Sequence, residues 1–424
     1  MNRVVDHPLV SMLRDLKGNA RGCVYTEPLW GIPFNLYAPY ASIYMLSFGL
    51  VDSQIGLIVS IGLAFQIIFA LLSGAITDKL GRRKTTLIFD ALSWSIPTFI
   101  WAIAQNFNYF LIAAMINSVW RVTHTSWSCL LVEDAKQEQL VDIYSWIYIS
   151  GLLSAFVAPL AGLLINRFTL IPAVRGLYGL AFVMMTIKFI ATYRMTTETR
   201  QGLVRMEQTR HQSLLALLGE YRGVVGQILK TPETLYTLGV MLIMSATSTI
   251  NGTFWSILVT EKLHIQAEHL AWYSFARSVT MLLFFFLVMP RIRGLNFKNP
   301  MLIGLVGFIT NQLILISIPE KSYFLLLLGV IIDACSFAAF GIFLDKMVVI
   351  TVNPQERARM LSIMYVIVLV FISPMGWIGG KLSEVNRNFP FMLDIIAFAL
   401  CFLLIFATPI RKSEEDLETY QTVP

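Results

Sequence analysis

The residues of this sequence with the clearest chemical potential are charged side chains inside long apolar stretches. Arg121, Arg277 and Asp333 lie well within such stretches, and Glu27 and Asp90 lie within about two helical turns of the end of one. A charge at the centre of a hydrocarbon layer costs about 3 kcal/mol on insertion scales, so each such residue is expected to serve function or to pair with another group. The expected chemistry is ion pairing, proton exchange at the carboxyl groups and contact with a polar solute.

One of these charges belongs to a polar stripe. Asn117, Arg121, His124, Thr125 and Ser128 are spaced so that they share one face of a helix. This face must look into a cavity or toward a partner helix. A purely structural arginine that ties helices together through backbone carbonyls is the alternative, and His124 is more typical of a hydrogen-bonding residue than of a titrating one.

Further polar residues follow helical spacing elsewhere. Asn35, Asn251 and Trp255 lie on such faces, and Arg277 and Asp333 lie 8 and 11 residues from the expected outer ends of their helices. Their depths therefore differ by about one turn, which would allow an ion pair. Lys188 and Asp394 lie nearer to helix ends, and we expect them to be structural, with Lys188 reaching the lipid headgroups.

Long helices must position these residues, and the composition supports them. The 424 residues are 56% hydrophobic and 14% charged, so most of the chain must be solvated by lipid. Apolar runs recur at the length that crosses about 30 Å of hydrocarbon as a helix. The sequence predicts an all-α membrane protein with twelve transmembrane helices, over 24–48, 53–76, 85–106, 108–132, 143–166, 177–193, 235–259, 269–290, 300–318, 322–345, 359–380 and 389–410. Pro28, Pro33 and Pro39 would let the first of these bend.

The distribution of basic residues predicts the orientation. With the N-terminus inside, the loops and tails assigned to the cytoplasm carry 22 of the 32 Lys and Arg residues, and the outer loops carry six. By the positive-inside rule both termini are expected in the cytoplasm. A polar central loop, 194–234, separates two six-helix bundles, 24–193 and 235–410, and the segments 1–23 and 411–424 are expected to be cytoplasmic.

Several functional classes are not supported by the sequence. No cluster of basic residues is interleaved with aromatic residues as in a nucleic-acid-binding surface. No arrangement of catalytic side chains is evident, so neither an enzyme nor a cofactor is expected. The His and Glu residues of the outer loops are too irregular for a metal site. Cys23, Cys129, Cys335 and Cys401 lie in or beside apolar runs and are expected to be core residues rather than disulfide partners.

The most specific motif lies between the second and third expected helices. It runs from Gly74 to Lys84 and reads GAITDKLGRRK. Gly74 permits close helix packing, Gly81 permits a tight turn, and Asp78 with Arg82 and Arg83 can form a breakable ionic latch. The segment lacks the glycine and lysine spacing of a P-loop. A run of basic residues that only stops membrane insertion on the cytoplasmic side is an alternative interpretation.

This motif resembles the signature loop of the major facilitator superfamily, Gly-x-x-x-Asp-x-x-Gly-Arg-Arg/Lys, in sequence and in position. The resemblance implies two six-helix bundles, with helices one, four, seven and ten lining a central cavity. It implies that Asp78 faces the start of the eleventh helix, near 358–362, and that an arginine of the motif pairs with Glu133 or Asp134. The segment from Arg121 to Thr125 also looks like an element of drug:proton antiporters, with two positions changed.

We therefore expect a secondary transporter that works by alternating access in a cell membrane, as a monomer with lipid, solute and proton as its partners. Proton-coupled efflux of amphiphilic or anionic organic compounds is the first hypothesis. Proton-coupled uptake of a small anionic nutrient, a lipid flippase and a transport-inactive sensor are the alternatives. The protonation candidates are Glu27, Asp90 and Asp333, and the candidate cavity residues are Asn35, Arg121, His124, Asn251, Trp255, Arg277 and Asp333.

Overall fold

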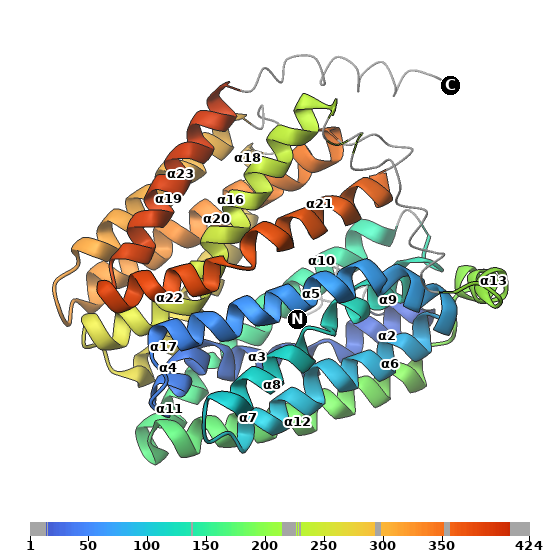
Figure 1. Ribbon diagram of the computed structural model, residues 1–424, viewed down its shortest axis with the longest axis horizontal. Helices are drawn as coiled ribbons and strands as arrows, with labels where there is room; N and C mark the ends of the chain where they lie inside the picture. The colour runs from blue at the N-terminus through green and yellow to red at the C-terminus, as the bar shows by residue number, and fades with distance from the viewer. Residues whose placement is uncertain are drawn as a thin grey trace, which may run out of the picture. The chain divides into compact units, whose positions relative to one another are not determined.

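The computed structural model is helical throughout its described part and contains no strand there. The described residues are 16–136, 139–213, 230–292, 298–351 and 357–407, together with Arg14, Gly226 and Ile228. Most of the expected terminal segments, 1–23 and 411–424, and part of the central loop lie outside them. The chain forms two compact units (Figure 1). The first comprises 1–54, 61–220 and 266–275, and the second comprises 55–60, 221–265 and 276–424.

The first unit contains the helices before the central loop and one helix, α13, within it. They are α2 (Gly18–Thr26), α3 (Pro28–Tyr37), η2 (Ala38–Tyr40), α4 (Ala41–Leu46), α5 (Asp52–Leu80), α6 (Arg82–Asp90), η3 (Ala91–Ser95), α7 (Ile96–Ala102), α8 (Phe107–Asn117), α9 (Trp120–Val132), α10 (Leu140–Ser154), η5 (Ala155–Val157), α11 (Ala158–Phe168), α12 (Leu170–Met195) and α13 (Arg200–Thr209). Helix α12 packs against α2, α3, α6, α7 and α11, so it is central to the packing of this unit.

The second unit is built on α16 (Pro232–Ile257) and α19 (Lys298–Ser317). The remaining helices are η7 (Leu258–Lys262), η8 (Ala267–His269), α17 (Leu270–Leu287), α18 (Met289–Ile292), α20 (Tyr323–Thr351), α21 (Arg357–Ile372), α22 (Met375–Val385) and α23 (Phe389–Ala407). Of these, η8 and the start of α17 belong to the first unit. Helix α19 packs against α20 and α23, and α16 packs against α20, α21, α22 and α23.

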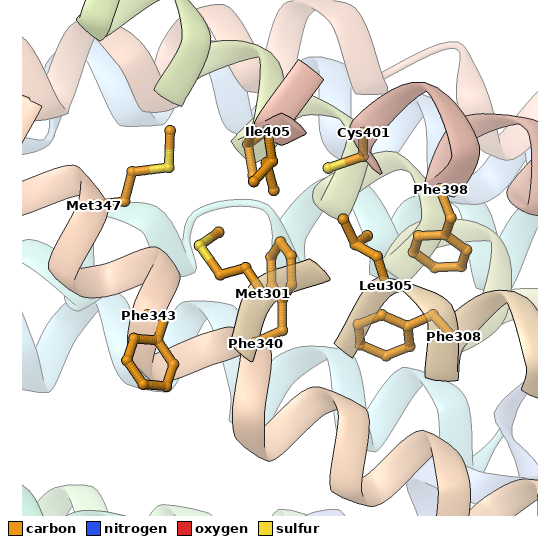
Figure 2. Packing of buried hydrophobic residues seen from close by; sticks show 10 residues of the cluster. Met301, Leu305, Phe308, Phe340, Phe343, Met347, Phe398, Cys401 and Ile405 are labelled. Atoms are coloured by element: carbon orange, nitrogen blue, oxygen red, sulfur yellow. The ribbon is translucent and has the colours of Figure 1, made fainter. Parts of the chain in front are cut away.

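Each unit has an apolar core. In the second, side chains from α16, α19, α20 and α23 meet, and the rings of Phe308 and Phe398 stack with centroids 5.0 Å apart (Figure 2). In the first, Cys23 packs with Leu130, Leu131 and Ile143. The described part of the chain keeps all four cysteines as free thiols.

Nine helical segments in the described residues are long and apolar enough to cross a membrane. They are Asp52–Leu80, Ile143–Phe168, Leu170–Met195, Pro232–Lys262, Ala267–Leu287, Lys298–Ser317, Tyr323–Asp345, Met360–Val385 and Phe389–Ala407.

The other three expected spans, 24–48, 85–106 and 108–132, are each divided into shorter helices. In the first, the breaks fall at Pro28 and at the 3₁₀ turn that contains Pro39, because proline removes a backbone donor. In 85–106, a π-helical turn, η3, follows Asp90. In 108–132, α8 ends at Asn117 and α9 begins at Trp120.

Candidate functional site

The turn between α5 and α6 depends on Gly81. Its φ of 84° lies in a region that other residues rarely adopt. A Cβ at this position would also come within 2.6 Å of a Glu198 carboxylate oxygen and 2.8 Å of the Met206 sulfur. Glycine is therefore required twice, for the backbone and for the space. Gly74 lies half-buried nearly two turns before the end of α5.

Arg82 joins two carboxylates beside this turn. Its Nη1 donates to Asp78 at 2.9 Å, and its Nε and Nη2 donate to Glu133 at 3.0 to 3.2 Å. Its side chain is only 5% exposed, so these charge-assisted bonds are well shielded from water. Of the two acids that the sequence offered for this pairing, the structure brings Glu133 to Arg82. Asp134 instead accepts from Asn19 and from the Arg200 backbone.

The second oxygen of the Asp78 carboxylate accepts hydrogen bonds from the central loop. Arg205 of α13 donates to Asp78 Oδ2 from Nη2 at 2.6 Å and from Nε at 2.9 Å. Thr209 reaches the Asp78 carbonyl at 3.3 Å, and Lys79 donates to the Gln212 carbonyl at 2.9 Å. Helix α13 is thus docked on the motif by several independent bonds. The expected contact of Asp78 with 358–362 stays a prediction.

Glu198 holds the first turn of α6. Its two carboxylate oxygens accept from the backbone N–H groups of Arg82 at 2.8 Å and Arg83 at 3.0 Å. These are donors that a helix start leaves without an intrahelical partner, and a negative charge is favoured there. Arg83 donates to the Tyr193 carbonyl and stacks over the Tyr193 ring at 3.9 Å. The contacts of Glu198 and Arg205 with the motif could not be predicted from the sequence, because both residues lie more than 100 positions away from it and no spacing pattern relates them.

A second group of charges lies inside the first unit. Lys188 of α12 is 3.6 Å from Glu27, at the junction of α2 and α3, and 4.0 Å from Asp90, at the end of α6. The Lys188 side chain is 6% exposed. The expectation that Lys188 reaches the headgroups is therefore wrong: its face of α12 is turned toward α2 and α6. The Glu27 Oε2 and Asp90 Oδ2 atoms are buried and accept no hydrogen bond from any residue that the structure describes.

The residues of the predicted polar stripe do not all lie on one helix. Arg121 donates to Gln66 of α5 at 2.9 Å and lies over the Trp120 ring at 4.2 Å. His124 meets the same ring edge-on at 5.7 Å. Asn117, at the end of α8, donates to the Ser93 carbonyl. In α3, Asn35 donates to the Gly31 carbonyl of its own helix.

The polar residues of the second unit form two groups rather than one. Arg277 of α17 donates to Asp333 of α20 at 3.1 Å, the pair that their depths suggested, and it lies over the Phe337 ring at 4.9 Å. Asn251 of α16 instead donates to Asp394 of α23 at 2.6 Å and accepts from Gln312 of α19 at 3.0 Å. Trp255 lies one turn beyond Asn251, half-buried.

The contact of Gln312 with Asn251 was not predicted, because a single Gln in an apolar helix does not indicate which residue it contacts.

These features define a multi-pass membrane protein with a buried charge cluster in its first unit and an ion pair between helices of its second. The family model of the Major Facilitator Superfamily matches residues 30–250, and the chain belongs to this family.

Solved structures agree on the fold. Two crystal structures of the nucleoside transporter NupG have TM-scores of 0.71 and 0.69 at 17% identity, covering 92% of this chain and 98% of that chain. A crystal structure of the peptide transporter POT in complex with sulfate has a TM-score of 0.68 at 12% identity, covering 96% and 99% of the two chains. At these identities the likeness shows the fold alone. The comparison with curated proteins finds no match. The family and its fold make the chain a transporter rather than an enzyme.

Proposed function

We propose that this protein is a proton-coupled secondary transporter for an organic solute, and that its coupling proton binds at the group formed by Glu27, Asp90 and Lys188. The observation that carries this proposal is the burial of two acids around one base. Ionisable groups inside a membrane protein are typical of proton pathways, because their burial is otherwise unfavourable.

The charges of this group explain why a proton should bind. With all three side chains ionised, the group has one net negative charge, and uptake of one proton makes it neutral. A buried charge without a counter-charge is costly, so proton binding should relieve that cost. Lys188 lies between the two acids, and a proton on either one would leave it paired with the other. Because the group joins α2, α6 and α12, its protonation can alter how these helices pack.

The transport cycle we infer is alternating access between two six-helix bundles, 24–193 and 235–410, with both termini in the cytoplasm. The membrane would contain twelve spans, of which three are the divided segments described above. This topology is supported by the excess of basic residues in alternate loops.

For the solute we propose an amphiphilic or anionic organic compound, exported in exchange for protons by a monomer. The support is Arg121, whose guanidinium lies against Trp120 and Gln66 in a membrane segment. Uptake of a small solute is the second candidate, because the similar solved structures are described as nucleoside and peptide transporters.

Purified protein in liposomes with an internal pH dye would test the coupling. The solutes to be tested are anionic amphiphilic dyes, nucleosides and dipeptides, and each is added with and without an imposed pH gradient. We expect at least one solute to move protons with it. Expulsion of trapped solute by an inward proton gradient indicates export, whereas its accumulation indicates uptake. A solute that is transported with no proton movement would overturn the coupling.

The variant Asp90→Asn tests the residues. Because Glu27 and Lys188 remain as a balanced pair, we expect this variant to fold and to exchange solute for solute. It should lose the solute movement that the proton gradient drives in the wild type. Glu207→Gln on the exposed surface of α13 is the matched control and should keep both activities. Full proton-driven solute movement by Asp90→Asn would remove Asp90 from the proposal.

A further inference from the structure

Three polar side chains meet inside the second unit, away from its ion pair. Asn251 donates to Asp394 Oδ2 at 2.6 Å, and Gln312 Nε2 donates to Asn251 Oδ1 at 3.0 Å and lies 3.5 Å from Asp394 Oδ2. The three residues come from α16, α23 and α19, and α23 packs directly against both α16 and α19. Asp394 is fully buried and Gln312 is 2% exposed. Asn251 is half-buried, whereas Asp394 and Gln312 are too deeply buried to complete their hydrogen bonds with bulk solvent.

Two atoms of the polar triad lack a hydrogen-bond donor among the described residues. They are Asp394 Oδ1 and Gln312 Oε1, and both are buried. Both are acceptors, so they cannot satisfy each other unless a donor is added. Reversing the Gln312 amide does not help, because its oxygen would then face Asn251 Oδ1 and Asp394 Oδ2. Buried acceptors without donors are rare, because each one loses its hydrogen bonds to water and gains none in return.

Within the described part of the chain, no cation balances the Asp394 carboxylate, and no ion pair includes it. The charged residues on the elements packed against α23, and on η7 after α16, are Glu233, Glu261, Lys262, Lys298, Lys381 and Glu384. Of the lysines, Lys262 donates to Ile316 and Asn388, Lys298 donates to the Phe406 carbonyl, and Lys381 pairs with Glu384. An ionised Asp394 would thus be a buried charge without a counter-charge among the described residues, which is strongly unfavourable.

We propose that Asp394 binds a proton, so that a neutral carboxylic acid occupies this site and donates from Oδ1 toward Gln312 Oε1. The added proton removes the buried charge and supplies the missing donor for two acceptors in one step. The carboxylate gains one proton and one O–H bond forms, so the site changes from −1 to neutral. A divalent metal ion fits less well, because such ions take about six oxygen ligands and the triad has two unused oxygens. This site lies in the second unit and is separate from the Glu27, Asp90 and Lys188 group.

Infrared difference spectroscopy of the whole protein tests the proposal directly. A protonated carboxyl group has a C=O absorption distinct from that of a carboxylate, and it shifts in D₂O. We expect a carboxylic-acid band at neutral pH that is lost in Asp394→Asn and displaced in Gln312→Ala, where the acceptor is removed. Glu384→Gln, in the exposed pair of α22, is the matched control and should leave this band unchanged. A wild-type spectrum that is unchanged by Asp394→Asn would overturn the proposal.

Thermal unfolding gives an independent measurement. Because an amide can also donate to Gln312, Asp394→Asn should keep the melting temperature within a few degrees of wild type, and a failure to fold would count against a neutral acid. The wild-type melting temperature should fall at alkaline pH, as loss of the proton leaves a buried charge, and this decrease should be smaller in Asp394→Asn. Sodium chloride and choline chloride should have the same effect on the wild-type melting temperature. A rise in melting temperature that is specific to sodium and depends on Asp394 would instead assign a metal cation to the site. None of these readouts uses transport, so they stand apart from the Asp90 experiment.

Discussion

Arg205 and Asp78 are joined by two hydrogen bonds to one carboxylate oxygen, at 2.6 Å and 2.9 Å. Arg82 holds the other oxygen of Asp78 and extends the contact to Glu133. Arginines and carboxylates therefore alternate from the central loop through the signature loop to the end of α9. A change at Asp78 should affect this whole arrangement.

The first prediction concerns Asp78→Asn. An amide lacks the negative charge that holds both arginines, whereas Arg82 keeps its bonds to Glu133. We expect strongly reduced flux in liposomes, with expression and melting temperature close to wild type. Glu207→Gln on the same docked helix, α13, is the control and should transport normally. Flux at the wild-type level in Asp78→Asn would remove the latch from the mechanism.

The second prediction concerns Arg277 and Asp333. Replacing either with Ala leaves the other charge unpaired. The side chains are 41% and 27% exposed, so the cost should lie between the ~1 kcal/mol of exposed pairs and the roughly 3–5 kcal/mol of buried ones. We expect both single variants to melt at lower temperature and the double variant to recover part of the loss. Strictly additive losses would show that the pair does not stabilise the protein.

The third prediction separates transport from folding at Arg121. Its side chain contacts Gln66 and Trp120. We expect Arg121→Ala to abolish flux with a small change in melting temperature. Gln66→Ala, which removes the hydrogen-bond acceptor and keeps the charge, should have a weaker effect on flux. Unfolding of Arg121→Ala would instead identify this arginine as a structural tie.

The fourth prediction concerns orientation. Glu207 on α13 and Glu320 before α20 are both well exposed, at 79% and 69%, and are suitable positions for single cysteines in a cysteine-free background. In intact cells an impermeant thiol reagent should label Glu320→Cys, and Glu207→Cys only after the membrane is opened. The reverse pattern would place the central loop outside.

The contacts that the sequence predicted depend on local spacing or on a motif. Arg277 and Asp333 could be matched because depth in a membrane follows from counting residues along each helix. The pairing of Arg82 with Glu133 followed from the family resemblance. Apolar length predicts twelve spans, of which nine are long and apolar helices in the described residues. It does not predict the breaks at η3 and after α8, since residues 91–95 and 117–120 have no proline.

The contacts that were missed depend on how each helix is rotated about its axis. Lys188 is only a few residues from the end of its apolar run, so depth alone favoured the headgroups. Whether this face meets lipid or Glu27 is decided by the packing of α12, which sequence spacing does not report. The same holds for Asp394 and Gln312, whose helices approach each other in a rotation fixed by the large core of the second unit.

The arrangement of Glu27, Asp90 and Lys188 also has a consequence for biosynthesis. The two acids are made before the lysine that neutralises them, and at about 5–20 residues per second the roughly 100 residues between Asp90 and Lys188 take about 5–20 s to synthesise. During this interval the early helices leave the ribosome with acidic groups that have no basic partner. We expect stable insertion of the first half to wait for α12. Its nascent chains should therefore remain sensitive to protease until translation has passed Lys188.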